Sequence, residues 1–293
     1  MKKVMSPRMM LITSMVIFGT LGPFVRNIPV TSGELALYRA VLAAALVGIF
    51  LLITGQRLSV GSVKKEIFLL LLSGGAMGFN WILLFEAYCY TSVAVATLCY
   101  YMAPVIIILV SPLLFNERIN GKKLCCILAA LIGIVLVSGV LNPTEEGNGD
   151  YRGVLLGLAA AVLYATVMLL NKFIKGVTGL QRTFIQFLAA IIVLLPYVAF
   201  GSGFRFSELD GRGFRMLLIV GLVHTGITYC LYFSSLKELP GQETAILSYI
   251  DPLVAVICSV FVLGEAISLP QILGGVLILG FTLWSELPVR KRK

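Results

Sequence analysis

Long apolar runs separated by short polar segments occupy most of the 293-residue chain. Each run is close to the roughly 20 residues that an α-helix needs to cross about 30 Å of hydrocarbon. Lipid offers the backbone no hydrogen bonds, and the alternating pattern of a membrane barrel is missing, so the runs predict helices. We therefore predict an all-α membrane protein with ten transmembrane helices. Their expected ranges are 9–26, 33–54, 66–88, 92–115, 121–141, 153–173, 181–200, 214–236, 241–263 and 269–286.

Two of these runs follow one plan. Residues 91–119 read TSVAVATLCYYMAPVIIILVSPLLFNERI, and residues 239–267 read LPGQETAILSYIDPLVAVICSVFVLGEAI. Each contains a tyrosine, a proline three residues later and a glutamate 13 residues beyond the proline. The matched pairs, all 148 residues apart, are Tyr101 and Tyr249, Pro104 and Pro252, and Glu117 and Glu265. The chain is thus predicted to be a duplication, with these two segments as its paired central helices.

The duplication predicts how the chain is divided. We expect a first five-helix repeat at 1–142, an extracytoplasmic linker at 143–152 and a second five-helix repeat at 153–293. An odd number of helices in each repeat makes the second copy enter the membrane upside down. Inverted repeats place a substrate site near the midplane, between the copies. Glu117 and Glu265 then lie at opposite membrane faces, and we interpret both as structural.

Composition and charge agree with a membrane protein. The chain is 59% hydrophobic and 13% charged, whereas soluble domains carry about 25% charge. The net charge of +9 would suggest nucleic acid in a soluble chain, but here the positive residues fall in short loops. Of the 23 lysines and arginines, 17 lie on the side of the N-terminus, 5 lie on the other side, and Arg39 lies within a helix. This excess predicts that both termini are cytoplasmic and leaves no reason to expect a nucleic-acid partner.

Motifs for cofactors, metals and catalysis are missing from the sequence. The six cysteines lie in apolar runs without a CxxC motif, and the single histidine cannot form a metal site alone. Neither a phosphate-binding Walker loop nor a hydrolase motif occurs. We expect no cofactor, no metal and no ATP hydrolysis, so energy for any transport must come from the solute or an ion gradient.

The two proline-centred segments, the glutamate after each and Arg39 in the second helix resemble the EamA-type transporters of the drug/metabolite transporter superfamily. The resemblance covers nearly the whole chain and both halves. It implies a basket of helices around a central cavity, lined by the early helices of each half. It also implies transport of small organic compounds such as amino acids, other metabolites or drugs.

The two prolines are candidate hinges. A proline inside a helix removes one hydrogen bond and frees the carbonyl four residues earlier. Pro104 and Pro252 occupy matched positions in the two repeats, as symmetric rocking of two halves would require. The alternative is that they are packing kinks.

Three ionisable residues within the membrane are candidates for substrate binding or coupling. Asp251 is the acid deepest in a predicted span, where a charge is expensive, and it either binds a substrate cation or proton or stabilises the kink at Pro252. His224 is either a proton-relay or substrate residue or a satisfied core histidine. Arg39 either faces the cavity and holds a carboxylate or phosphate, or pairs with Glu34 or reaches toward the interface.

Aromatic and amide side chains recur at positions expected to line the cavity. Rings with polar tips suit amphipathic or cationic solutes, although helix packing and interface anchoring are the alternative roles for each. The candidates are Asn80, Trp81, Tyr101, Tyr164 and Tyr249.

These observations predict a secondary transporter or facilitator in the cytoplasmic membrane, most simply an exporter of amino acids or related compounds by alternating access. Its partners are the lipid bilayer and a small-molecule substrate, and Asp251 and His224 are the candidate groups if protons are coupled. We expect a monomer or a weak dimer. The alternative is a membrane-embedded enzyme acting on lipid-like substrates, which requires His224 and Asp251 to meet in one pocket.

Overall fold

The computed structural model describes residues 5–56, 60–115, 119–139, 151–177 and 179–287, and all regular secondary structure in these ranges is helical. The α-helices are α1 (Pro7–Gly19), α2 (Leu21–Val25), α3 (Ser32–Ile53), α4 (Val60–Tyr90), α5 (Val93–Tyr100), α6 (Ala103–Phe115), α7 (Gly121–Val137), α8 (Tyr151–Phe173), α9 (Gly179–Tyr197), α10 (Gly211–Leu218), α11 (Thr228–Leu236), α12 (Gly241–Ser248), α13 (Ile250–Phe261) and α14 (Leu269–Glu286). Two π-helical segments, η1 (Val198–Ser202) and η3 (Ile219–Ile227), and a 3₁₀ turn, η2 (Phe206–Glu208), complete the set.

The predicted helix starts coincide with side-chain caps. The first turn of a helix has backbone N–H groups without a partner in the helix. A short polar side chain just before the helix can accept a hydrogen bond from one of them. Thr31, Ser92 and Asn120 cap α3, α5 and α7 in this way, at 3.2, 3.1 and 2.9 Å. Local sequence therefore determines where these helices begin.

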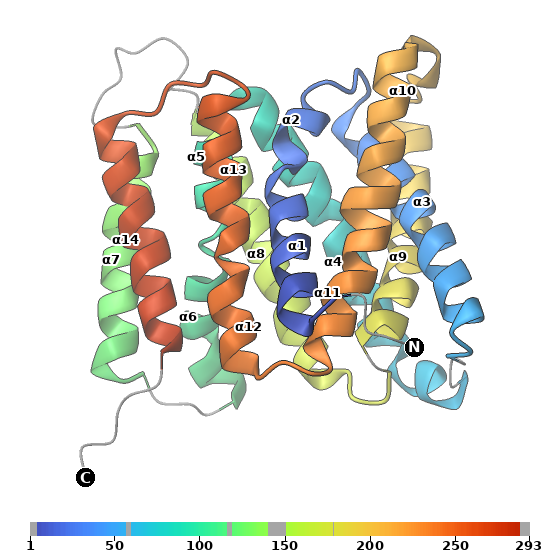
Figure 1. Ribbon diagram of the computed structural model, residues 1–293, viewed down its shortest axis with the longest axis horizontal. Coiled ribbons are helices and arrows are strands. Elements are labelled where there is room, and N and C mark those ends of the chain that lie inside the picture. Colours follow the sequence, from blue (N-terminus) through green and yellow to red (C-terminus); the bar gives the residue numbers. More distant parts are fainter. Residues whose placement is uncertain (1–4, 57–59, 116–118, 140–150, 178, 288–293) are drawn as a thin grey trace.

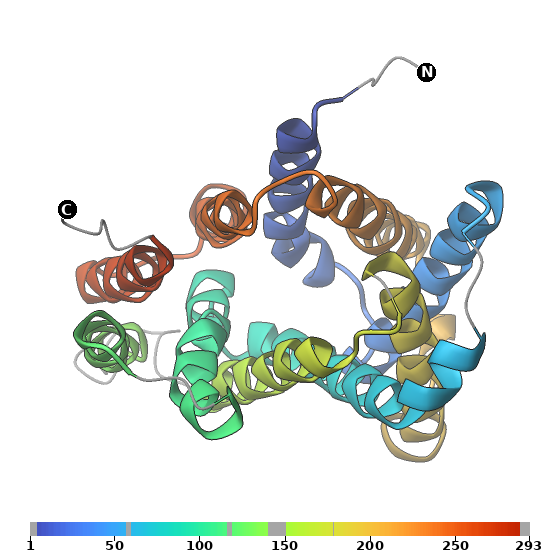
Figure 2. The same ribbon diagram turned by 90° about the horizontal axis from the view of Figure 1, so that it is seen from below.

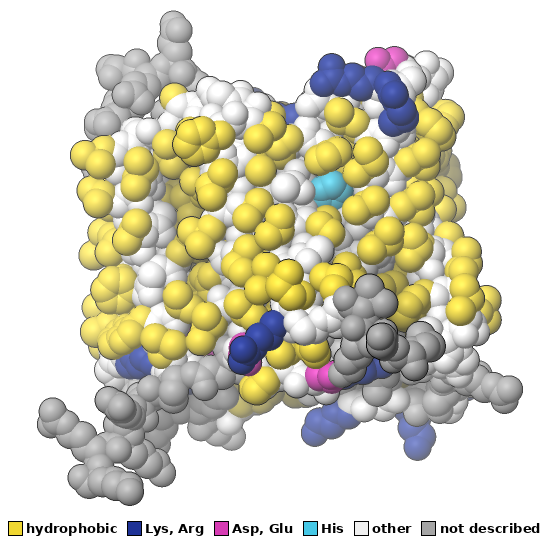
Figure 3. Space-filling view, viewed as in Figure 1, with side chains coloured by type: hydrophobic (Ala, Val, Ile, Leu, Met, Phe, Trp, Pro, Cys, Tyr) yellow, Lys and Arg dark blue, Asp and Glu magenta, His cyan; other side chains and the backbone are white. Residues whose placement is uncertain are grey.

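The outer surface is suited to lipid. Eight helical segments are long and apolar enough to cross a membrane, and Pro7–Gly19 is a shorter apolar helix. Figure 3 shows hydrophobic side chains covering the height of the molecule, with the basic and acidic ones gathered toward its two ends. Leu52, Leu113, Phe200 and Phe261 are among the large apolar side chains that are exposed. The chain is a multi-pass membrane protein, as predicted.

The helices run between two ends of the molecule, called here the lower and upper ends as drawn in Figure 1. α1 begins and α14 finishes at the lower end. Seen from below, α1, α4, α8, α9, α11 and the segments containing α5 and α13 form a ring, while α7 and α14 stand together outside it (Figure 2). The ring surrounds the interior in which the candidate site lies.

Both central segments are interrupted at matched places. α5 ends at Tyr100 and α6 begins at Ala103, while α12 ends at Ser248 and α13 begins at Ile250. Pro104 and Pro252 therefore lie in the first turn of a new helix, where a missing N–H costs little. The sequence predicted continuous helices kinked at the prolines, and the structure differs by breaking each helix just before its proline.

The eighth predicted span, 214–236, is one rod, but its middle third is π-helical. The hydroxyls of Thr225, within η3, and of Thr228, directly after it, donate to carbonyls five residues earlier, at 2.9 and 2.7 Å. Wide turns are often found at functional sites. Here the π-helical stretch ends at Ile227, two residues before Tyr229, which faces the interior.

The linker was expected at 143–152, but Tyr151 and Arg152 already belong to α8. The rest of that linker, and Glu117, lie outside the described residues. Glu265 is described, and its contacts, given below, are structural ones between the two halves of the chain.

The pair α7 and α14 depends on two glycines. A Cβ on Gly133 would lie 2.8 Å from the carbonyl oxygen of Gly274, and a Cβ on Gly274 would lie 2.5 Å from that of Gly133. The two glycines therefore let α7 and α14 approach closely. In lipid such close packing holds helices together, because the hydrophobic effect does not favour their association there. No side chain can enter here unless the helices separate.

We predict that Gly133→Val or Gly274→Val lowers the stability of the purified protein by about 1–3 kcal/mol, the usual cost of overpacking. Thermal unfolding in detergent would measure the change. Gly280→Val, on the same helix but facing open space, is the control and should leave the melting temperature unchanged. Equal effects at all three positions would contradict close packing as the cause.

Candidate functional site

A cavity of about 420 Å³ lies inside the ring of helices. Its volume falls within the range of about 300–1,000 Å³ that is usual for small-molecule sites. Lining residues come from mid-height, such as Asn80 and Asp251, and from the lower ends of helices, such as Lys172 and Leu236. The cavity therefore extends from the middle of the molecule to its lower end.

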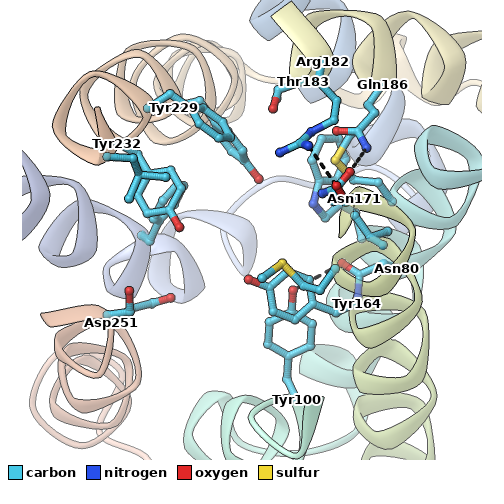
Figure 4. A pocket seen from close by; sticks show the side chains of 18 of the residues that line it. Asn80, Tyr100, Tyr164, Asn171, Arg182, Thr183, Gln186, Tyr229, Tyr232 and Asp251 are labelled. Atoms are coloured by element: carbon cyan, nitrogen blue, oxygen red, sulfur yellow. Dashed lines mark hydrogen bonds between the residues drawn. The ribbon is translucent and has the colours of Figure 1, made fainter. Parts of the chain in front are cut away.

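Aromatic side chains form two walls of the cavity. Tyr100 and Tyr164 stack with ring centroids 5.0 Å apart, and Tyr229 and Tyr232 face them from α11 (Figure 4). Phe233 packs beside Tyr232, with a centroid distance of 5.1 Å. Rings with hydroxyl tips give a cavity both apolar area and hydrogen-bonding groups.

Asp251 lies at the helix break in the second half of the chain and faces the cavity (Figure 4). The hydroxyl of Tyr101, from the break in the first half, donates to its Oδ2 at 2.7 Å. The two breaks therefore meet at this hydrogen bond, which orients the carboxyl group. A carboxylate can accept several hydrogen bonds, so it retains capacity for a ligand.

An amide network holds the wall opposite Asp251. The Asn80 amide donates to the carbonyl of Ala160 at 2.6 Å. Gln186 Nε2 donates to Ser73 Oγ at 2.7 Å and to Asn171 Oδ1 at 2.8 Å. These bonds satisfy buried polar groups and fix the positions of α4, α8 and α9 around the cavity.

Arg182 and Lys172 bring positive charge to the lower part of the cavity. Arg182 Nη1 donates to the carbonyls of Asn171 and Ile174 at 3.0 and 3.4 Å, at the end of α8. Its Nε is buried and has no hydrogen-bond partner. The sequence pattern predicted for both residues only the role of loop charges that set orientation. The signal that could have identified Arg182 is its spacing of one helical turn from Gln186.

Five of the predicted site residues line the cavity: Asn80, Trp81, Tyr101, Tyr164 and Asp251. Three others do not. Tyr249 lies at the helix break between α12 and α13, where its side chain meets Thr282 of α14. Arg39 and His224 also lie outside the cavity lining.

Arg39 is 3% exposed and lies behind the cavity wall. Its Nε donates to Thr225 Oγ1 at 2.6 Å, and its guanidinium lies 4.5 Å from the ring centroid of Trp81. The sequence suggested Glu34 as a partner of Arg39, but Glu34 instead accepts from the Tyr38 hydroxyl and the Arg205 backbone N–H. Arg39 therefore positions Trp81, which does line the cavity.

His224 is 2% exposed and has partners of its own. Its Nε2 is 3.1 Å from Thr20 Oγ1, and its ring packs on Phe24 with centroids 4.7 Å apart. Asp251 has a different partner, Tyr101. The acid–base pair that a membrane-embedded enzyme would need is not formed between these two side chains. Within the described ranges, no group of three or more His, Cys, Asp or Glu side chains could hold a metal ion.

Above the cavity, the two halves of the chain are tied together. Arg26 Nη2 lies 2.8 Å from Glu265 Oε1, an ion pair without hydrogen-bond geometry, and donates to the Thr91 carbonyl at 2.6 Å. Glu265 Oε2 accepts from the Val93 N–H at 2.9 Å and from the Ser259 hydroxyl. A carboxylate at the first turn of α5 also suits the positive end of that helix. We call this set of contacts the upper clasp.

Helices approach closely beneath the upper clasp. A Cβ on Gly19 would lie 2.5 Å from the carbonyl oxygen of Asp251, and a Cβ on Gly22 would lie 2.5 Å from a methyl group of Val93. α1 and α2 therefore press against α13 and α5 without space for a side chain. This contact and the clasp close the upper end above the cavity.

Known proteins share this architecture. The family model described as "EamA-like transporter family" matches residues 5–139 and 151–285. The uncharacterized transporter YxxF of Bacillus subtilis is 32% identical over 268 residues, which cover 92% of this chain and 85% of the relative. An uncharacterized transporter of Archaeoglobus fulgidus is 33% identical over 201 residues, or 67% of this chain and 68% of that protein. A crystal structure of another protein matches with a TM-score of 0.64 at 19% identity, covering 94% of this chain and 96% of that one.

The helical membrane fold, its cavity lined by apolar, aromatic and polar side chains, and the relatives named as transporters together define the class. The protein is a multi-pass membrane transporter of small molecules. The chain belongs to the EamA-like transporter family of the drug/metabolite transporter superfamily. The resemblance on which the sequence analysis relied is thereby confirmed.

We predict that Arg39→Lys destabilises the protein by about 1–2 kcal/mol, since a desolvated cation–π contact contributes about that much. The lysine ammonium cannot keep both the stacking on Trp81 and the hydrogen bond to Thr225. With Trp284 replaced by Phe, Trp81 is the remaining tryptophan, and its emission should change as its cover is lost. Thermal unfolding and fluorescence measure the two effects. The exposed Arg215→Lys is the control, and an Arg39→Lys protein that matches it in both measurements would refute the positioning role.

Proposed function

We propose that this protein is a secondary transporter or facilitator that moves small organic metabolites, amino acids or related compounds, out of the cell by alternating access. The observation that carries the proposal is the cavity of about 420 Å³ between the two halves, which extends to the lower end and is closed above by the upper clasp. Alternating access requires such a state, with one side of a central site sealed.

We propose ten membrane spans with both termini cytoplasmic. Adding α1 and α7 to the eight long apolar segments gives the ten. Among the described residues, basic side chains favour the lower end, where α1 begins and α14 finishes, and cytoplasmic loops are the ones enriched in lysine and arginine. In this orientation the cavity opens to the cytoplasm, which is the side from which an exporter takes up its substrate.

We propose that the two helix breaks act as hinges of inverted repeats. Pro104 and Pro252 lie at matched breaks, and the hydrogen bond from Tyr101 to Asp251 joins the breaks at the cavity. A substrate that reaches Asp251 would compete for this bond, so that binding and bending are linked. The repeats proposed are residues 1–142 and 153–293, and the family model matches once in each.

The proposal is tested by reconstituting the purified chain in proteoliposomes and measuring uptake of labelled metabolites with and without an imposed ion gradient. Saturable uptake of at least one solute, absent from empty liposomes, is the expected result. A protein that is fully folded and moves none of a broad set of amino acids, metabolites and cationic drugs would not be the proposed transporter.

We predict that breaking the upper clasp opens the upper end. Hydrogen bonds to charged groups contribute about 1.5–3 kcal/mol, so Glu265→Gln should raise the open fraction roughly tenfold or more. The test uses Val93→Cys in a background without the native cysteines. Val93 is fully buried, so the rate at which a membrane-impermeant maleimide labels the new cysteine measures the open fraction. The exposed Glu208→Gln is the control. Unchanged labelling of Val93→Cys would show that the clasp does not hold the upper end closed.

We predict that replacing Pro104 and Pro252 together by alanine slows transport more than it weakens substrate binding, because alanine restores the missing N–H groups and stiffens both breaks. Turnover in proteoliposomes and affinity from thermal shifts separate the two quantities. Pro112 and Pro196, which lie inside α6 and α9 without matched partners, provide the control double variant. An equal loss of binding and turnover would point to a direct ligand role instead.

A further inference from the structure

The wall of the cavity that α11 forms depends on how this helix is turned about its axis. The residues of α11 in the lining are Tyr229, Tyr232, Phe233 and Leu236, and Figure 4 shows Tyr229 and Tyr232 directed into the cavity. Such spacing, with steps of three or four residues, is that of one face of an α-helix. Rotation of α11 would therefore replace this whole set of side chains by another.

The segment directly before the start of α11 is the π-helix η3, which covers nine residues, Ile219–Ile227. π-helices are rare and mostly occur as single turns. Because each bond of a π-helix joins residues five apart instead of four, the wide turns hold an extra residue. One residue corresponds to a rotation of about 100° in an α-helix. The geometry of η3 therefore sets which face of α11 meets the cavity.

Polar side chains in and beside η3 follow the same wide spacing. The hydroxyls of Thr225 and Thr228 donate to carbonyls five residues earlier, at 2.9 and 2.7 Å. His224 Nδ1 lies 3.4 Å from the carbonyl oxygen of Ile219, again five residues earlier. These contacts add to the backbone bonds of the wide turns and favour the π-helical form.

Threonines in the α-helices of the same chain bond differently. Thr166 in α8 and Thr282 in α14 each donate to the carbonyl four residues earlier. A helical threonine hydroxyl usually reaches a carbonyl three or four residues earlier. The step of five residues at Thr225 and Thr228 therefore belongs to the wide turns and not to threonine as such.

Neighbouring helices hold two of these side chains from outside. Nε of Arg39, in α3, donates to Thr225 Oγ1 at 2.6 Å. His224 Nε2 lies 3.1 Å from Oγ1 of Thr20, which lies between α1 and α2. His224, Thr225 and Thr228 are all buried, and lipid offers polar groups no other partners. The backbone geometry that satisfies these groups together is therefore the favoured one.

We propose that His224, Thr225 and Thr228 are positioning residues, which hold η3 in its π-helical form and thereby turn the tyrosine face of α11 toward the cavity. Without their bonds, η3 takes the commoner α-helical pattern, and each residue of α11 moves into the place that the following residue held. The lining set from this segment then becomes Thr228, Leu231, Tyr232 and Ser235. This inference goes beyond the proposed function, because it holds for any solute and for either direction of transport.

The test is a cysteine scan of positions 229–236 in the full chain, purified in detergent, on a background without the native cysteines. The rate of labelling by a water-soluble maleimide is measured at each position. We expect fast labelling where the side chain lines the cavity and slow labelling at Leu231→Cys and Ser235→Cys, because neither residue is part of the lining.

The scan is repeated with Thr225→Val and Thr228→Val together, which removes both hydroxyls and keeps the shape of the side chains. We expect the pattern to move by one residue. Labelling should become about tenfold faster or more at Leu231→Cys and Ser235→Cys, and slower by a similar factor at Tyr229→Cys and Phe233→Cys. Each valine variant is also scanned alone, so that a double variant that does not fold leaves the test intact.

Two further double variants separate a change of register from a loss of stability. Thr225→Ser with Thr228→Ser keeps the hydroxyls and should keep the original pattern. Thr166→Val with Thr282→Val removes two hydroxyls from α-helices and should keep it too. An unchanged pattern in the folded valine variants would overturn the proposal. So would labelling that rises evenly along α11, since that result indicates looser packing without rotation.

The labelling pattern does not depend on transport, so this inference and the proposed function can fail separately. A pattern that moves by one residue in a protein that transports no solute supports the positioning role and contradicts the transport proposal. Saturable uptake by a protein whose pattern stays unchanged in the valine variants has the opposite meaning.

Discussion

Lipid cannot form hydrogen bonds with a polypeptide backbone, and the architecture of this protein follows from that constraint. Every regular segment in the described ranges is helical, and the outward side chains are largely apolar. Polar groups and helix breaks are therefore stable only where the interior offers hydrogen-bond partners or a cavity. The breaks before Pro104 and Pro252 lie at such a place, because Tyr101 and Asp251 are hydrogen-bonded to each other beside the cavity.

The same constraint explains how the two ends of the molecule differ. Above the cavity, Glu265 and Ser259 accept hydrogen bonds from the backbone N–H groups of Val93 and Ala94 in the other half, and Arg26 forms an ion pair with Glu265. Below it, Arg182 and Lys172 lie along the cavity, and Arg182 keeps one buried donor unused. Each end keeps one buried polar atom without a hydrogen-bond partner, Glu265 Oε1 above and Arg182 Nε below. The ends differ because the upper contacts join the two halves above the cavity, whereas the lower residues line it, as the proposed alternating access requires.

Buried charge in this fold serves more than one purpose. Arg39 is enclosed by Thr225 and the Trp81 ring and shapes the cavity wall from behind. Asp251 and Arg182, by contrast, face the cavity itself. The position of Arg39 in the sequence, inside an apolar run, is just as unusual as that of Asp251, so rarity alone could not distinguish a residue that supports the site from one that lines it.

The sequence by itself determined the helices, because apolar runs of about 20 residues have few other solutions in a membrane, and polar caps such as Thr31 and Asn120 mark where they start. It also predicted the repeat, since the spacing of Pro104 and Pro252 is visible without a structure, and it named Asp251 and Tyr101 as candidates, which both line the cavity. Only the tertiary structure decided that Arg182 joins the cavity, that His224 bonds Thr20 rather than meeting Asp251, and that Arg26 reaches Glu265. The physical reason is that these contacts join helices far apart in the chain, and hydrophobic patterning specifies which segments enter the membrane without specifying which side chains face one another.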